Sequence, residues 1–202
     1  MKKLFLFLVT VLSISSYTVA ADAYTIGSSV ADFKLKNIDG KEVSMSDYPD
    51  AKGFIITFTC NHCPYAKAYE DRIIALNKKY AGKGYPVIAI NPNDAEQYPE
   101  DNYDNMKVRA KEKNFTFPYL VDETQEIAKL FGAIKTPHIY IVQKEGKSLT
   151  VKYIGAIDDN WENPEIVNQK YVEDAVNALL ANKPVEVKTT KAIGCSIKWK
   201  KQ

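Results

Sequence analysis

The chain has 202 residues, of which 27 are Lys or Arg and 25 are Asp or Glu, giving a formal net charge of +2. The lysines are scattered, and the one dense basic stretch is the C-terminal KWKKQ, which is typical of a solvated end rather than a phosphate-binding patch. The sequence therefore predicts no nucleic-acid partner. Its length is sufficient for one domain with a full hydrophobic core.

The N-terminus has the organisation of a secretory signal peptide. Two lysines follow the initial methionine, then come the apolar stretch LFLFLVTVLSI and small residues up to Ala21. The apolar stretch is shorter than the about 20 residues needed to span a bilayer. We therefore expect residues 1–21 to be cleaved, leaving a periplasmic or otherwise extracytoplasmic protein without stable membrane insertion. An uncleaved anchor is the alternative. Residues 24–202 are expected to form one domain.

The first half of this domain begins with a predicted hairpin, because residues 32–45 alternate apolar and polar side chains around Asp-Gly. Residues 53–59, GFIITFT, are apolar and β-branched, as expected of a strand buried on both faces. A helix is predicted from Pro64 to about residue 80, where apolar side chains recur at helical spacing. A second buried strand is expected at residues 86–91.

The second half starts with a loop rich in Asn, Asp and Pro. The elements predicted after it are a polar helix at 104–113, a strand at 117–122, a helix at 123–133, two strands at 138–143 and 149–157, a helix at 167–182 and a C-terminal extension at 183–202. Strands alternate with helices early and form a hairpin late. This order predicts an α/β fold with a central mixed sheet flanked by helices.

Two cysteines, Cys60 and Cys63, lie where the first buried strand ends and the first helix begins. Unpaired N–H groups and the helix dipole favour negative charge there, which stabilises a thiolate. Pro64 suits the first helical turn because its missing N–H costs nothing. The arrangement suits a redox pair in which Cys60 attacks and Cys63 resolves the mixed disulfide. A structural disulfide and a metal site remain alternatives.

This strand, CxxC pair and helix, followed by Thr136-Pro137 before a later strand and by a closing hairpin and helix, resemble the thioredoxin fold. The segments TCNHCPYAKAYEDR, GAIKTPHIYI, GAIDDNW and TKAIGCSIKW are similar to its redoxin branch of peroxiredoxin-like and TlpA/ResA-like exported proteins. The resemblance implies a cofactor-free thiol–disulfide oxidoreductase that acts on disulfide- or thiol-bearing proteins with an external thiol donor. It also implies that Pro137 is cis and faces the cysteines, and that the backbone of Thr136 pairs with an incoming substrate strand.

His62 directly precedes Cys63, at a position where thioredoxin has proline and DsbA-like oxidants have histidine. A protonated imidazole stabilises the Cys60 thiolate, and thus the reduced form, so the disulfide becomes a stronger oxidant. We therefore expect a couple more oxidising than that of thioredoxin. The alternative is a solvated turn residue.

A peroxidase is the second functional class considered, because peroxiredoxins have the pattern P-x-x-x-T-x-x-C. Counting back from Cys60, Thr57 lies at the threonine position, but Gly53 stands where proline belongs. The strand after Pro137 also lacks the peroxiredoxin arginine. An antioxidant peroxidase pocket is therefore not supported by the motif, although peroxidase activity remains an alternative.

A copper or zinc carrier is the third class. The chain has two histidines, and they flank the two motifs that the expected fold brings together. Thiolates and imidazoles form a soft ligand set for Cu(I) or Zn. The candidate ligands are Cys60, Cys63, His62 and His138.

The C-terminal extension, residues 183–202, contains the third cysteine, Cys195. About 13 extended residues reach up to roughly 43 Å, so Cys195 can reach the cysteine pair as a third thiol. The alternative is an inert thiol that anchors a tail strand together with Trp199. Trp161 and Pro64 are expected to line a substrate groove.

Overall fold

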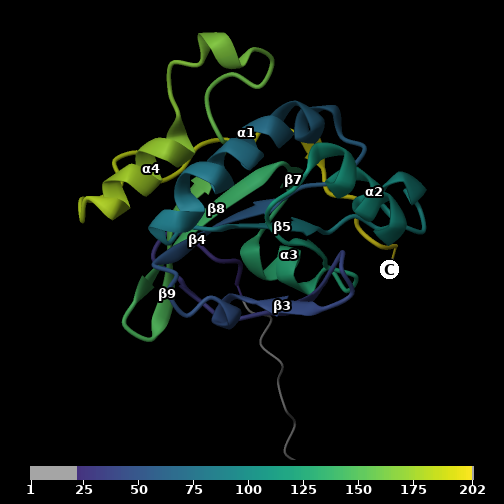
Figure 1. The fold of residues 1–202 in the computed structure, drawn as a ribbon, viewed down its shortest axis with the longest axis horizontal. Helices are drawn as coiled ribbons and strands as arrows, with labels where there is room; N and C mark the ends of the chain where they lie inside the picture. The colour runs from purple at the N-terminus through teal and green to yellow at the C-terminus, as the bar shows by residue number, and fades with distance from the viewer. Residues whose placement is uncertain (1–21, 202) are drawn as a thin grey trace, which may run out of the picture.

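The computed structural model describes residues 22–201, so the predicted signal peptide lies outside the described residues. A curled sheet of eight strands runs through the centre, and helices cover both of its faces (Figure 1). No helix within the described part of the chain is long and apolar enough to cross a membrane.

The sheet is mixed, as the order of predicted elements indicated. Its strands are β1 (Ser29–Val30), β2 (Lys34–Asn37), β3 (Glu42–Ser44), β4 (Gly53–Phe58), β5 (Val87–Asn91), β6 (Tyr119–Val121), β8 (His138–Glu145) and β9 (Ser148–Gly155). They lie side by side in the order β1-β9-β8-β4-β5-β6-β2-β3. Strand β4 is parallel to β5 and antiparallel to β8. The predicted N-terminal hairpin is the pair β2–β3.

All six residues of β4 are buried, because the strand lies between β8 and β5 near the centre of the sheet. Ile55 belongs to one hydrophobic cluster, whereas Phe54 and Ile56 belong to another on the opposite face. The helices are α1 (Pro64–Tyr80), α2 (Tyr103–Lys113), α3 (Glu126–Phe131) and α4 (Tyr171–Leu180). The first cluster contains side chains of α1, α2 and α4, and the second those of α3, so the sheet has a core on each face (Figure 1).

Several element boundaries differ from the prediction. Strand β6 begins at Tyr119 instead of residue 117, because Pro118 has no N–H to give to a neighbouring strand. Helix α3 begins three residues late, because Gln125 before it has a left-handed φ of 62°. Helix α4 begins at Tyr171, after a single 3-10 turn at Pro164–Ile166.

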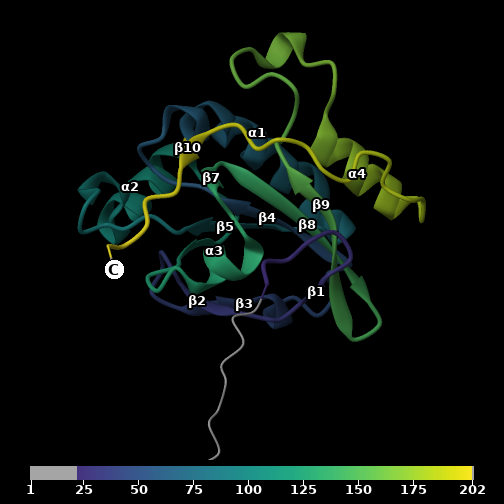
Figure 2. The same cartoon turned by 180° about the vertical axis from the view of Figure 1, so that it is seen from behind.

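The C-terminal extension crosses the molecule from α4 towards α2, as Figure 2 shows in yellow. Two of its residues form β10 (Cys195–Ser196), which pairs antiparallel with β7 (Lys135–Thr136) in a second, two-stranded sheet. Strand β7 was not predicted, since two residues are too few to show a period, whereas a tail strand at Cys195 was one of the two alternatives for the extension. The extension is therefore an ordered part of the fold.

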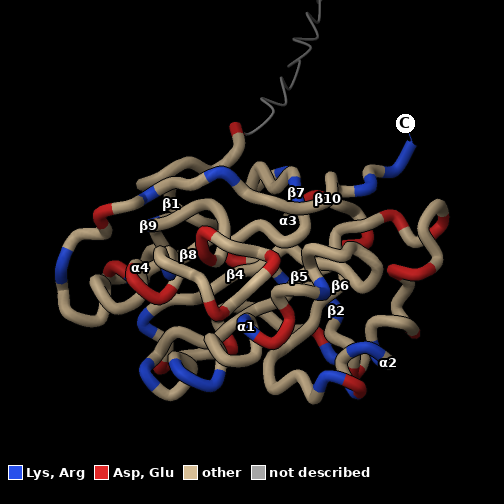
Figure 3. The backbone as a smooth tube through the Cα atoms, turned by 90° about the horizontal axis from the view of Figure 1, so that it is seen from above, with Lys and Arg blue, Asp and Glu red and all other residues tan. Residues whose placement is uncertain are grey.

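Basic and acidic residues are interspersed around the molecule, and the C-terminal end is basic (Figure 3). Exposed pairs such as Lys34 with Glu42 contribute little to stability. The Arg109 guanidinium differs because it makes two hydrogen bonds, of 2.7 and 2.5 Å, to the buried carboxylate of Glu70. This pair joins α2 to α1, and both of its residues line a small cavity together with Cys60.

Candidate active site

The two cysteines lie at the junction between β4 and α1. Cys60 follows the strand, and Cys63 is the N-cap residue of the helix, with Pro64 at its first position. The carbonyl of Cys63 accepts the N–H of Lys67 at 3.0 Å, which is the first turn of α1. Cys60 is 2% exposed and Cys63 is fully buried. The strand, turn and helix expected around the pair are therefore observed.

Thr136 lies against both sulfur atoms, although it is more than 70 residues away along the chain. The Thr136–Pro137 peptide bond is cis, as the resemblance implied. The Thr136 Oγ1 is 3.3 Å from the Sγ of Cys60, and the Thr136 carbonyl accepts the thiol of Cys63 at 3.1 Å. The structure thus joins the CxxC and Thr-Pro motifs into one site.

Cys60 and Cys63 also interact with each other through a shared proton. The hydrogen bond between them stabilises a single thiolate shared by the pair. The same hydrogen bond, burial and the negative charge of Asp101 raise the pKa of Cys60.

The contacts with Thr136 oppose this rise in the pKa of Cys60. A thiolate at Cys63 would face a carbonyl oxygen that has no proton to donate, whereas a thiolate at Cys60 accepts the Thr136 hydroxyl. Because these contacts are fixed by the backbone of Thr136, they favour the thiolate at Cys60. The predicted role of Cys60 as the attacking cysteine stays a prediction.

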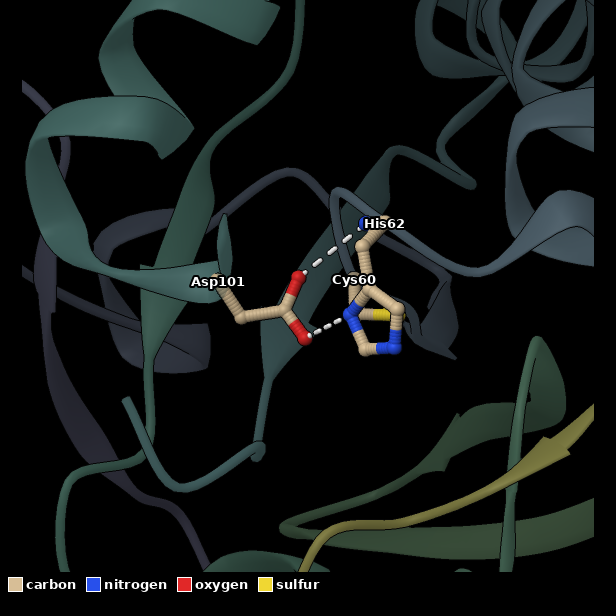
Figure 4. Close-up of side chains that lie close together, drawn as sticks. All are labelled: Cys60, His62 and Asp101. Carbon is tan, nitrogen blue, oxygen red and sulfur yellow. Dashed lines mark hydrogen bonds and ion pairs between the residues drawn. The ribbon is translucent and has the colours of Figure 1, made fainter. Parts of the chain in front are cut away.

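The turn between the cysteines is held by a residue that the sequence analysis missed, Asp101, which is 1% exposed. Its carboxylate accepts the backbone N–H groups of Asn61 at 2.8 Å and His62 at 3.1 Å, and the side-chain amide of Asn93 at 2.6 Å. Figure 4 shows it facing both His62 and Cys60. One signal was available: β4 and β5 are adjacent parallel strands, so the loops at their carboxyl ends meet.

His62 is fixed by the same carboxylate. Its Nδ1 lies 2.5 Å from Oδ2 of Asp101, and its ring stacks on Tyr98 with 5.8 Å between centroids and 8° between planes. The side chain is 26% exposed. His62 is therefore held in one orientation beside Cys60 rather than extending freely into solvent.

The two histidines do not converge on one site. His138 begins β8 and is buried, with its Nδ1 3.4 Å from both the Ile134 N–H and the Tyr140 hydroxyl, and burial lowers its pKa to about 4. Within residues 22–201, the one group of three potential metal ligands is Cys60, His62 and Asp101, whose ligand atoms lie within 4.8 Å of one another (Figure 4). The alternative set containing Cys63 and His138 is not brought together there.

The remaining predicted residues surround the pair. Cys195 in β10 packs against the cluster of Cys60, Cys63 and Ala66, as does Tyr65 at the start of α1. Trp161 is partly buried, and its ring lies 4.3 Å from that of Tyr65, so it borders the site. Pro64 is exposed at the start of α1. The tail is anchored by the buried Ile197 rather than by Trp199, which is 38% exposed.

A family model described as the AhpC/TSA family matches residues 26–151. The chain belongs to the AhpC/TSA family. An uncharacterized conserved protein from Geobacillus kaustophilus has a similar crystal structure, with a TM-score of 0.82 and 40% identity over 94% of this chain and 100% of that one. The exposed lipoprotein thioredoxin of Streptococcus pneumoniae strain TIGR4 matches with a TM-score of 0.54 and 24% identity over 75% of this chain and 99% of that one. The thioredoxin-like fold is thereby confirmed.

Among curated proteins, the chain is similar to the thiol-disulfide oxidoreductase ResA of Geobacillus thermodenitrificans strain NG80-2. The two are 24% identical over 149 residues, which is 69% of this chain and 79% of that protein. The expected resemblance to the redoxin branch and the expected class, an oxidoreductase, are confirmed.

Proposed function

We propose that this AhpC/TSA family member is an extracytoplasmic thiol–disulfide oxidoreductase in which Cys60 and Cys63 alternate between dithiol and disulfide. One observation carries the proposal: both sulfur atoms contact Thr136, while Cys63 is the N-cap residue of helix α1. A structural staple would need none of these contacts. The buried carboxylate of Asp101 places a negative charge beside Cys60, and its hydrogen bond fixes the ring of His62 there.

The exchange proceeds in two displacements. The Cys60 thiolate attacks one sulfur of a substrate disulfide, forming a mixed disulfide and releasing the first substrate thiolate. Cys63 then loses its proton, attacks Cys60 and releases the second substrate thiolate. Two electrons pass from the pair to the substrate, and the pair ends as a disulfide. Run in reverse, with an external thiol, the same steps reduce the pair.

The Thr136 hydroxyl donates a hydrogen bond to the Cys60 thiolate both before attack and when Cys60 leaves. The substrates are disulfide- or thiol-bearing proteins, and the electron donor is an external thiol. The predicted signal peptide supports an extracytoplasmic location. Cell fractionation tests it, and the mature protein should be found in the periplasmic or other extracytoplasmic fraction.

The test is a redox titration of the purified protein in dithiothreitol buffers, with the cysteines assigned by non-reducing peptide mass spectrometry. The expected result is a reversible Cys60–Cys63 disulfide and turnover of a disulfide substrate, both lost in Cys60→Ser. The double variant Cys60→Ser/Cys63→Ser is the matched control, because it retains Cys195. A pair that stays reduced under oxidising buffer, or turnover that persists in the double variant, would refute the proposal.

A further inference from the structure

The C-terminal strap, defined as residues 188–200, is fixed to the molecule on both sides of Cys195. Before it, Thr190 donates its N–H to the Ile154 carbonyl at 3.0 Å. After it, the N–H of Ile197 bonds to the Ile134 carbonyl at 3.2 Å, and that of Lys198 to Oδ1 of Asn93 at 2.9 Å. The position of Cys195 is therefore set by contacts distributed along the strap.

These contacts bring Cys195 to the residue that already contacts both catalytic sulfurs. Cys195 pairs with Thr136 across the β10–β7 ladder, in which paired Cα atoms lie about 4.5–5.5 Å apart. The approach is close, because a Cβ on Gly194 would lie 2.2 Å from the Thr136 carbonyl oxygen. Alternation along a strand then directs neighbouring side chains to opposite faces: Cys195 packs against the cluster that contains the pair, with its thiol next to that of Cys63, and Ser196 is exposed.

The pair is closed off from solvent, and Cys195 of the strap packs against its cluster. Cys60 is 2% exposed and Cys63 is fully buried, whereas Cys195 is half-buried and is the most accessible of the three cysteines. On the other side of Cys60, the cavity lined by Arg109 and Tyr119 is about 10 Å³, at the lower limit for one water molecule. An external disulfide therefore meets Cys195 before it can reach the other two sulfurs.

We infer that Cys195 is a third redox residue, which forms an exchangeable disulfide with Cys63 and relays oxidation between external thiols and the buried pair. The inference rests on the proposed function of that pair. It differs from an inert tail thiol because Cys195 lies on the face of β10 that contacts the pair.

The relay needs no additional oxidant. In the oxidised protein, Cys195 attacks the Cys63 sulfur; the Cys63–Cys195 bond forms, the Cys60–Cys63 bond breaks, and Cys60 leaves as a thiolate that takes the Cys195 proton. An external thiol then attacks Cys195, forming a mixed disulfide there and releasing Cys63 as a thiolate; a second external thiol attacks this mixed disulfide, frees Cys195 and leaves with the first as an external disulfide. In the opposite direction, Cys195 attacks an external disulfide and releases one external thiol. Cys63 then attacks the Cys195 sulfur and releases the second external thiol, and Cys60 attacks the Cys63 sulfur and releases Cys195 as a thiol.

The first test traps the relay disulfide in Cys60→Ser, treated with oxidised glutathione and analysed by non-reducing peptide mass spectrometry. The expected product is a Cys63–Cys195 link. The matched control is Cys60→Ser/Cys195→Ser/Ser196→Cys, which moves the thiol one residue to the outer face of β10 and should form no link to Cys63. A Cys60→Ser protein that gives only glutathione adducts, or a control that links as readily, overturns the inference.

The second test measures the rate at which oxidised glutathione converts the reduced pair to the Cys60–Cys63 disulfide. Cys195→Ser should lower this rate at least about tenfold while leaving the equilibrium potential of the pair unchanged, because a relay changes only the path of exchange. An unchanged rate overturns the relay. If the wild-type pair never forms its disulfide, the proposed function fails, and the trapped Cys63–Cys195 link still decides whether Cys195 is redox-active.

Discussion

The Asp101 side of the cysteine pair is held by hydrogen bonds to one buried carboxylate, whereas the β7 side is held by strand pairing and apolar packing. The first arrangement places charge beside Cys60 and so affects the stability of its thiolate. The second covers the sulfurs and so affects which molecules reach them. In the proposed oxidoreductase, redox strength and access to the sulfur atoms would therefore depend mainly on separate segments.

The largest expected effect comes from forcing the strap off β7. Gly194→Val adds a side chain where a Cβ already meets the Thr136 carbonyl at 2.2 Å, so the close pairing cannot form. Overpacking costs about 1–3 kcal/mol, which predicts about a tenfold to hundredfold faster alkylation of Cys60 and Cys63. Gly82→Val is the matched control, since nothing lies within 4 Å of its Cβ. Equal alkylation rates in the two variants would show that the strap does not shield the pair.

The second effect is a loss of stability in acid that originates at His138, on the β7 side. Burial lowers its pKa from 6.5 to about 4, so below pH 6.5 the unfolded chain binds a proton that the folded chain does not. Stability therefore falls with pH between 6.5 and 4, by about 2 kcal/mol at pH 5 relative to pH 8. Urea unfolding at both pH values measures this loss. His138→Gln should show a pH dependence smaller by that amount, and an identical dependence would contradict the prediction.

A smaller effect should follow from removing the charge on the other side. Asp101→Asn preserves the shape of the side chain but removes the negative charge that raises the pKa of Cys60. The reduced form is then stabilised, and the couple becomes more oxidising by about 30 mV for each pKa unit, or about 1.4 kcal/mol. Asp104→Asn on the exposed surface is the control with the same change of charge. A potential that falls, or that shifts equally in both variants, contradicts this role of Asp101.

The smallest effect is expected at the border of the site. Trp161→Ala removes the ring that packs on Tyr65 at 4.3 Å, and such aromatic contacts are worth about 0.5–1.5 kcal/mol. If Trp161 lines the substrate groove, KM for a protein disulfide should rise a few-fold with little change in kcat. Exchange with oxidised glutathione is the internal control and should stay unchanged, while an equal loss with both substrates would indicate a structural role only.

The sequence predicts the parts of this site that depend on local pattern. The buried run of β4, the cysteine pair and the proline at the start of α1 are contiguous, and each has a recognisable physical signature. Thr136-Pro137 is also short and local, and the resemblance to a known fold indicated that it faces the cysteine pair. The mixed sheet and its principal helices followed from the alternation of strand and helix patterns.

The parts that the sequence did not predict depend on the path of the loops and of the tail in the folded chain. Asp101 lies in a segment whose Asn, Asp and Pro content is typical of a solvated loop, and its burial follows only once β4 and β5 are adjacent. The length of the tail showed that Cys195 can reach the pair, but it did not predict the path that the tail follows across the molecule. Strand β10 is two residues long, so no periodicity marks it, and the backbone pairing with β7 determines its position.

The β10–β7 pairing has a consequence for any peptide that would bind at the same edge. The strap is part of the same molecule, so it competes with an external strand at an effective concentration that does not fall on dilution and is about millimolar for short tethers. Weak peptides at micromolar concentration would be excluded, and only partners that release the strap or react first with its thiol would gain entry. The strap would thus determine which peptides are able to reach the cysteines.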